Sequence, residues 1–147
     1  MTTEFDELVA KMGKVWVPCK NPPDIGDVPL DAGRMSGAEL SDWLGKTTAW
    51  YSYAQMQLGL SEARRLLLQK RFGRLVNEHI VAGQLKERTY ELQVAGALRI
   101  NPELRPLQVE IAELEAQGEI WSRSARAYEA YLTLFREEGN RRRWDKT

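Results

Sequence analysis

The stretch LQVEIAELEAQGEIWSRSARAYEAYLTLFREEG, residues 107–139, has the most regular hydrophobic pattern in this chain of 147 residues. Its apolar and small residues alternate steps of four and three, at Leu107, Ile111, Leu114, Gly118, Trp121, Ala125, Tyr128, Leu132, Phe135 and Gly139. This spacing keeps one stripe of a helix turned toward a partner helix, as in a coiled coil. It predicts a helix about 43 Å long from Leu107 to Phe135, at a rise of about 1.5 Å per residue.

A second long helix is predicted to begin just after Ser36. Ser36 and Glu39 have the spacing of a capping box, and no proline follows until Pro102. A stripe with helical spacing then runs through Leu40, Leu44, Thr47, Tyr51, Ala54 and Leu58. Near Gly59 to Ser61 the stripe becomes ambiguous, so we expect a kink or break there, with Ser61 capping a new turn.

An interruption near Gly83 is expected to separate this helix from the next segment. A shorter helix carrying Leu85, Thr89, Leu92 and Gly96 is predicted to end at Asn101, because the residue before a proline is disfavoured in the α region. Asn101 and Pro102 suit the N-cap and first position of the final helix. Gly45, Gly59 and Gly73 are evenly spaced, which fits either close backbone approach or chance.

The region before Ser36 has a different composition. Its prolines and glycines predict an irregular arm over about residues 15–35, with Pro18, Pro22, Pro23 and Pro29. Ahead of the arm, Phe5, Leu8, Val9 and Met12 predict a short amphipathic helix. We therefore expect a single domain, with a short helix and Pro-rich arm over residues 1–35 and a helical domain over 36–147. The predicted fold is all-α, an elongated long-helix hairpin or bundle with coiled-coil-like packing.

An elongated hairpin buries little apolar surface within one chain, so we expect other copies to cover the remainder. The predicted assembly is a homo-oligomer. Its expected interface is the seam of the last helix, formed by Leu107, Ile111, Leu114, Trp121, Tyr128, Leu132 and Phe135.

Composition excludes several classes of protein. Cys19 is the one cysteine and His79 the one histidine, so an intrachain disulfide and the usual zinc ligand sets are ruled out. No apolar run approaches the roughly 20 residues of a membrane-spanning helix. The start of the sequence lacks a basic segment followed by an apolar one, so no signal peptide is expected. We therefore expect a cytoplasmic protein.

Residues for catalysis are few, and each has a structural interpretation. His79 follows Leu75 at a heptad position and fits a partly buried structural histidine better than a general base. Cys19 fits a packed thiol. The acidic residues of 110–119 fit a solvated face, and no glycine-rich phosphate loop is present. We therefore expect no catalytic residue, no metal site, no cofactor and no enzymatic activity.

Basic residues form two clusters although the formal net charge is zero, with 21 basic and 21 acidic residues. The central cluster is Arg64, Arg65, Lys70, Arg71 and Arg74, and the C-terminal cluster is Arg141, Arg142 and Arg143, beside Trp144. Basic side chains among aromatic ones are typical of single-stranded nucleic acid binding. Such runs also occur on solvated helix faces and at helix C-termini, where they complement the helix dipole.

Taken together, these features resemble the UvsY-type recombination mediators of bacteriophages. The resemblance covers about residues 40–143 and rests on SDWL (41–44), ARRLLLQKRF (63–72), the helix from Leu107 to Phe135 and the arginine-rich tail. Members of that family form rings that hold single-stranded DNA and help load a phage recombinase onto it. The resemblance implies the recombinase and single-strand binding protein as partners, and the central basic residues as the phosphate contacts.

Two hypotheses about function follow. The first is a non-enzymatic, oligomeric, single-stranded-DNA-binding recombination mediator. The second is a phage structural, assembly or adaptor protein that acts through helical protein–protein contacts, for which the heptad seam and the Pro-rich arm are the motivation.

Overall fold

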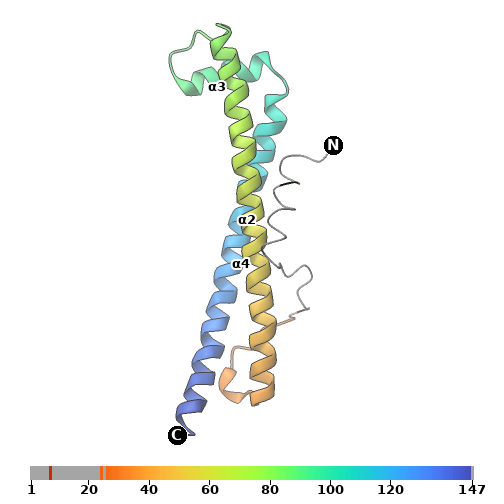
Figure 1. Cartoon of the computed structure of the whole chain (residues 1–147), viewed down its shortest axis with the longest axis vertical. Helices are drawn as coiled ribbons and strands as arrows, with labels where there is room; N and C mark the ends of the chain where they lie inside the picture. Colours follow the sequence, from red (N-terminus) through yellow and green to blue (C-terminus); the bar gives the residue numbers. More distant parts are fainter. Residues whose placement is uncertain (1–6, 8–23, 25, 147) are drawn as a thin grey trace.

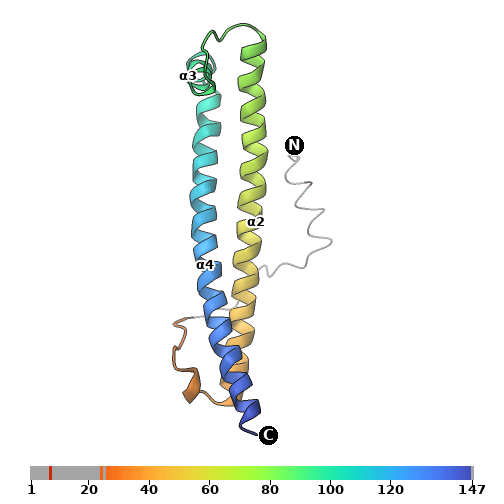
Figure 2. The same ribbon diagram turned by 90° about the vertical axis from the view of Figure 1, so that its left-hand side faces the viewer.

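The structure is a computed structural model that describes residue 7, residue 24 and residues 26–146. Its elements are a short 3-10 helix η1 (Ala32–Arg34) and the α-helices α2 (Gly37–Val81), α3 (Tyr90–Ile100) and α4 (Leu104–Trp144). Helices α2 and α4 run antiparallel along a rod (Figures 1 and 2). Helix α3 lies at the end where they are joined, and η1 lies at the other end. The predicted all-α elongated hairpin is confirmed.

Local sequence signals set the start and end of α2. Ser36 Oγ accepts a hydrogen bond from the Glu39 N–H at 3.1 Å, and the Glu39 carboxylate accepts one from the Ser36 N–H at 2.6 Å. This is the predicted capping box. At the other end Gly83 has φ +71°, a left-handed conformation that glycine adopts without steric cost. The predicted interruption near Gly83 is therefore confirmed.

The break predicted at Gly59 to Ser61 is wrong, because α2 runs as one helix of 45 residues. Ser61 is buried within the helix and does not cap a new turn. A glycine in a helix interior costs only about 1 kcal/mol, which packing along a helix of this length offsets. A Cβ atom added at Gly45, Gly59 or Gly73 would meet nothing within 4 Å, so close backbone approach does not explain their spacing.

The third helix begins later than predicted. Thr89 Oγ1 accepts a hydrogen bond from the Leu92 N–H at 3.4 Å and caps α3, so Leu85 and Thr89 precede the helix. Leu85 is buried in the core at this end of the rod. The predicted end at Asn101 is confirmed, and the Asn101 side chain accepts a hydrogen bond from the Glu103 N–H at 3.0 Å. The first residue of α4 is Leu104 rather than the predicted Pro102.

The core is divided between the two ends of the rod. At the α3 end, Val76, Leu85, Ala97 and Leu104 form one buried cluster. At the η1 end, Phe135 packs with Ala32 and Leu40. Between them, the buried residues of α2 are mostly small, and the set along both helices is Thr47, Ala54, Met56 and Ser61 on α2 and Leu114, Ala125 and Leu132 on α4. Two long helices can therefore approach closely along the middle of the rod.

Several predictions fall on residues outside the described ones. The amphipathic helix of Phe5 to Met12 is among them, as is the arm before Asp24. Within residues 26–35 the backbone is irregular apart from η1, as predicted. None of the described helices is long and apolar enough to cross a membrane.

Candidate nucleic-acid interface

Three cations of the central cluster lie together on the exposed surface of α2. Lys70, Arg71 and Arg74 are all exposed, and in the part of the chain that the structure describes none of them forms an ion pair. Lys70 and Arg74 are four residues apart, which places their Cβ atoms about 5–6 Å from each other on a helix. We call Lys70, Arg71 and Arg74 the cationic face. Its positive charges have no described carboxylate to neutralise them.

The other two members of the central cluster contact α4. Arg64 Nη2 lies 2.6 Å from Glu110 Oε1, and Arg65 Nη1 lies 3.9 Å from Glu115 Oε1. Arg65 also donates a hydrogen bond to the Gln69 side chain at 3.3 Å. These half-exposed pairs contribute about 0–1 kcal/mol each to the stability of the hairpin. The predicted cluster is thus divided between contacts within the chain and the cationic face.

In the C-terminal cluster, Arg141 and Arg142 are engaged by the chain itself. Arg142 donates hydrogen bonds to the backbone carbonyls of Met35 at 2.6 Å and Ala32 at 3.0 Å, and to Glu138 at 2.6 Å. Arg141 is paired with both Glu138 and Asp145. The Arg142 guanidinium attaches the segment before α2 to the end of α4, so its role as a nucleic-acid contact stays a prediction.

Glu138 lies at the centre of these contacts. Its side chain is only 10% exposed and receives hydrogen bonds from both Arg141 and Arg142. Hydrogen bonds from Arg141, and then from Arg142, lower the pKa of Glu138 from 4.5 to about 2. Arg143, the remaining member of the C-terminal cluster, is exposed and remains available to a partner.

The predicted interface residues of α4 face α2 of the same chain. Leu114, Leu132 and Phe135 are buried, with Phe135 fully so. These three side chains are already buried within the hairpin, and their role as contacts between copies stays a prediction. Leu107, Ile111, Trp121 and Tyr128 are half-buried and retain some exposed surface. The homo-oligomer itself stays a prediction.

A row of aromatic rings connects α2 with α4 in the middle of the rod. Trp50 stacks on Tyr128 with ring centroids 5.7 Å apart and an interplanar angle of 28°. Tyr53 lies edge-on to Trp121 at 5.6 Å and to Trp50 at 5.9 Å. Burial, with a smaller contribution from Tyr131, raises the pKa of the Tyr128 phenol. Sequence reasoning placed Trp121 and Tyr128 in the seam but missed Trp50 and Tyr53 as their partners.

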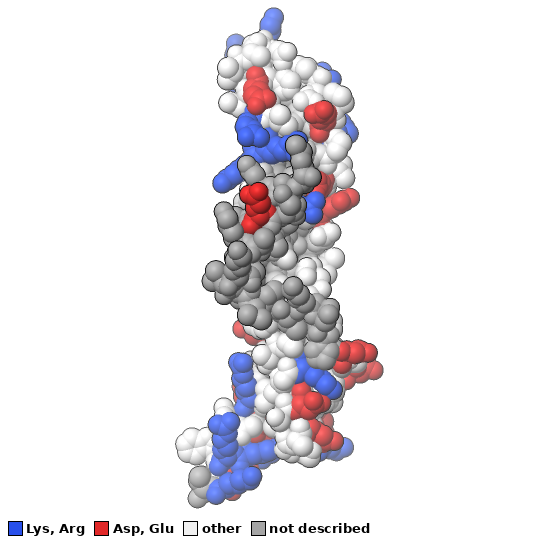
Figure 3. Space-filling view, turned by 45° about the vertical axis from the view of Figure 1, so that its right-hand side comes forward, with Lys and Arg blue, Asp and Glu red and all other residues white. Residues whose placement is uncertain are grey.

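The surface carries charges of both signs. On the face shown in Figure 3, Lys and Arg side chains gather near both ends of the rod, with Asp and Glu side chains among them. A polyanion that approached either end on this face would therefore meet side chains of both signs.

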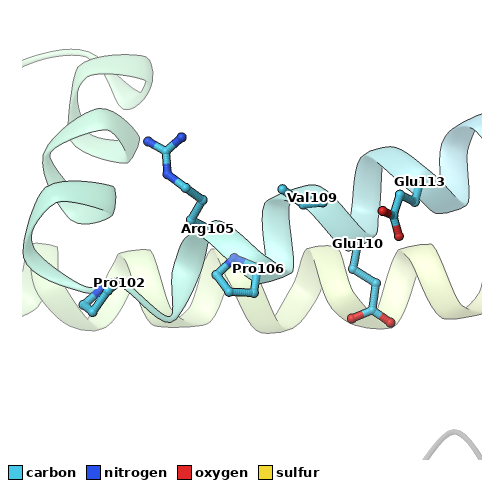
Figure 4. A pocket seen from close by; sticks show the side chains of 6 residues that line it. All are labelled: Pro102, Arg105, Pro106, Val109, Glu110 and Glu113. Atoms are coloured by element: carbon cyan, nitrogen blue, oxygen red, sulfur yellow. The ribbon is translucent and has the colours of Figure 1, made fainter.

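An open hollow near the start of α4 has mixed chemistry. In Figure 4, Glu110 extends over α2, whereas Arg105 points toward α3. The residues around the hollow are Pro102, Arg105, Pro106, Val109, Glu110 and Glu113. Glu110 pairs with Arg64, and the residues around the hollow include no serine, threonine, cysteine or lysine that could act as a nucleophile.

The remaining candidates for chemistry have structural partners where they are described. His79 Nδ1 lies 2.6 Å from Gln84 Oε1, at the turn that ends α2. In the acidic stretch of α4, Glu110, Glu115 and Glu119 lie within ion-pair distance of arginines. Among the described residues, no group of His, Cys, Asp and Glu is arranged to hold a metal ion. Cys19 lies outside the described residues.

The geometry thus contains a cationic face, an aromatic row and a C-terminal arginine cluster that is largely engaged within the chain. Comparisons with protein-family models, with curated proteins and with solved structures find no match to this chain.

Proposed function

We propose that this protein is a non-enzymatic single-stranded-DNA-binding protein that acts as a recombination mediator, helping to load a phage recombinase onto DNA. The observation that carries the proposal is the cationic face, where Lys70, Arg71 and Arg74 are exposed and form no ion pair with the described residues. The recombinase, the single-strand binding protein and the oligomer enter through the resemblance to UvsY-type mediators.

The spacing within the cationic face supports an anionic ligand. Like charges three or four residues apart on a helix destabilise it by about 0.2–0.5 kcal/mol per pair. Lys70 with Arg74, and Arg71 with Arg74, are two such pairs. A phosphate backbone neutralises this repulsion and releases condensed counterions, which makes the interaction favourable and dependent on salt. Binding through phosphates also predicts little preference among bases.

Fluorescence polarisation with a labelled oligonucleotide tests the proposal. The variant Lys70→Glu/Arg71→Glu/Arg74→Glu should bind much more weakly than wild type. Each phosphate contact adds about 0.7 to the slope of log affinity against log salt for single strands, so the loss of three contacts should lower the magnitude of the slope by about 2. Circular dichroism should show unchanged helicity, because exposed substitutions usually change stability by less than about 0.5 kcal/mol.

A matched control separates the cationic face from overall charge. The variant Arg123→Glu/Arg126→Glu/Arg136→Glu makes the same change in net charge at exposed positions of α4. Its salt slope should stay close to that of wild type. The proposal is wrong if wild-type protein at micromolar concentration gives no polarisation change at low salt, or if the two triple variants weaken binding equally.

The mediator role needs a separate measurement. We expect the protein to speed assembly of recombinase filaments on an oligonucleotide that is already coated with single-strand binding protein. The triple variant of the cationic face should lose this effect. If the protein binds DNA but does not speed filament assembly, it is a DNA-binding protein and the mediator role is wrong.

A second candidate function is a structural, assembly or adaptor protein that acts through helical contacts. The observation in its favour is the set of large apolar side chains that remain exposed on the described helices, at Leu66, Val81, Tyr90, Leu92, Ile100, Val109, Ile120 and Trp144. Mass photometry without nucleic acid should then show oligomers. Loss of assembly in Tyr128→Glu, with any DNA binding independent of the central basic residues, would favour this function over the first.

A further inference from the structure

The aromatic row lies on the side of the interface between α2 and α4 rather than in its centre. At its level the centre is occupied by Ala54 and Ala125, which are 0% and 3% exposed. Because these small side chains let the helices approach closely, large rings do not fit between them. The four rings of the row, Trp50, Tyr53, Trp121 and Tyr128, are all half-buried and keep part of their surface exposed.

The row lies on the same side of the hairpin as the central arginines. On α2, Trp50, Arg64 and Arg71 are separated by multiples of seven residues, which keeps them on one side of the helix. On α4, Glu110 and Tyr128 are 18 residues apart, which is about five turns. Since Arg64 contacts Glu110 and Trp50 contacts Tyr128, both contacts fall on this side.

Rings and cations therefore follow one another along the rod. From Trp50 to Arg74 the strip extends about 36 Å along α2, at about 1.5 Å per residue. A stacked single strand with about 3.4 Å between phosphates would place about ten nucleotides over this length. A strand whose phosphates lie on Arg71 and Arg74 can thus continue to the rings without leaving the strip.

We propose that the aromatic row is a base-stacking subsite, which takes unpaired nucleobases of a strand whose phosphates lie on the cationic face. This inference rests on the proposed function. It adds that the rings contact the bases of the bound strand, whereas the cationic face contacts its phosphates. Every base has a flat face, so stacking tolerates any sequence, and one stacked base contributes roughly 5- to 140-fold in affinity. Cations without the rings would bind any polyanion, whereas the rings select for exposed bases.

An abasic oligonucleotide separates the two contributions, because it keeps the phosphates and lacks the bases. Polarisation with full-length protein should show at least about 5-fold tighter binding of a normal oligonucleotide than of an abasic one of equal length. In Trp50→Leu this preference should fall toward one, while affinity for the abasic strand stays unchanged. The matched control Trp144→Leu changes an exposed tryptophan at the end of α4 and should keep the full preference.

A second readout needs no variant. The normal oligonucleotide should quench the tryptophan fluorescence of wild-type protein at saturation, and the abasic strand should quench it much less. This keeps the inference testable if Trp50→Leu loses its fold in circular dichroism.

The outcomes distinguish this inference from the proposed function. If neither oligonucleotide binds wild type, the proposed function fails, and the inference with it. If both bind equally and quench equally, the inference is overturned while the cationic face stands. If Trp50→Leu lowers the assembly mass in mass photometry and leaves the preference for bases unchanged, a second copy covers the rings and the inference is again overturned.

Discussion

Arg142 offers a sharp test of the difference between a structural arginine and a DNA contact. Its guanidinium donates to the carbonyls of Met35 and Ala32 and to Glu138, and so joins the end of α4 to the segment before α2. The change Arg142→Gln removes the charge and shortens the side chain. We expect it to reduce the free energy of unfolding and to leave affinity for single-stranded DNA unchanged.

The magnitude follows from which partners lose their bonds. A charge-assisted hydrogen bond is worth about 1.5–3 kcal/mol, so a simple sum over three would be roughly 4.5–9 kcal/mol. Ala32 O still accepts from the Met35 N–H at 3.3 Å, and Glu138 keeps its hydrogen bonds from Arg141. The Met35 carbonyl loses a partner that nothing else among these contacts replaces. The expected loss is therefore about 1.5–3 kcal/mol, the value of one such bond.

Urea unfolding followed by circular dichroism measures this loss, and polarisation measures DNA affinity. Arg143→Gln is the matched control, since it makes the same chemical change at the exposed neighbouring position and should alter stability by less than about 0.5 kcal/mol. The structural interpretation is refuted if Arg142→Gln weakens DNA binding with no loss of stability, because the guanidinium would then contact the ligand.

Two further predictions concern the same end of the rod. Because the pKa of Glu138 is about 2 in the folded chain and 4.5 ordinarily, its contribution to stability is present above about pH 4.5 and is lost as the pH falls toward 2. Glu138→Gln should accordingly flatten the decline in Tm between about pH 5 and pH 2, and an unchanged decline would contradict the assignment. Phe135 is fully buried against Ala32 and Leu40, so Phe135→Ala should cost about 3–5 kcal/mol in urea unfolding, and a loss below about 1 kcal/mol would contradict the packing.

Signals that act within a few residues could be predicted from the sequence. The capping box of Ser36 and Glu39 and the turn at Gly83 each depend on neighbouring atoms, and both were found. The break at Gly59 to Ser61 was predicted by the same local reasoning and is wrong. Whether a helix continues through a glycine depends on what packs on it over its whole length, which a window of a few residues does not contain.

The seam of α4 shows a different limit. Its spacing correctly indicated that one stripe faces a partner, but a heptad pattern is the same whether that partner is another helix of the chain or another copy. Leu114, Leu132 and Phe135 are buried within the hairpin, so the pattern identified the buried stripe, while its assignment to contacts between copies stays a prediction. The register of α2 on α4 decides which side chains of the stripe the chain itself buries, and no single segment of the sequence specifies that register.

The same register decides which cations remain for a ligand. Arg64 lies opposite Glu110, and because the helices are antiparallel, the position seven residues further along α2 lies opposite the very start of α4. The carboxylates of α4 that pair with α2, Glu110 and Glu115, therefore lie on one side of this point and the cationic face lies beyond it. Arg64 and Arg71 are equivalent in sequence pattern and differ in what the partner helix places across from them. Within the central cluster, the pairs with Glu110 and Glu115 thus take up Arg64 and Arg65 and leave Lys70, Arg71 and Arg74 without an ion pair among the described residues.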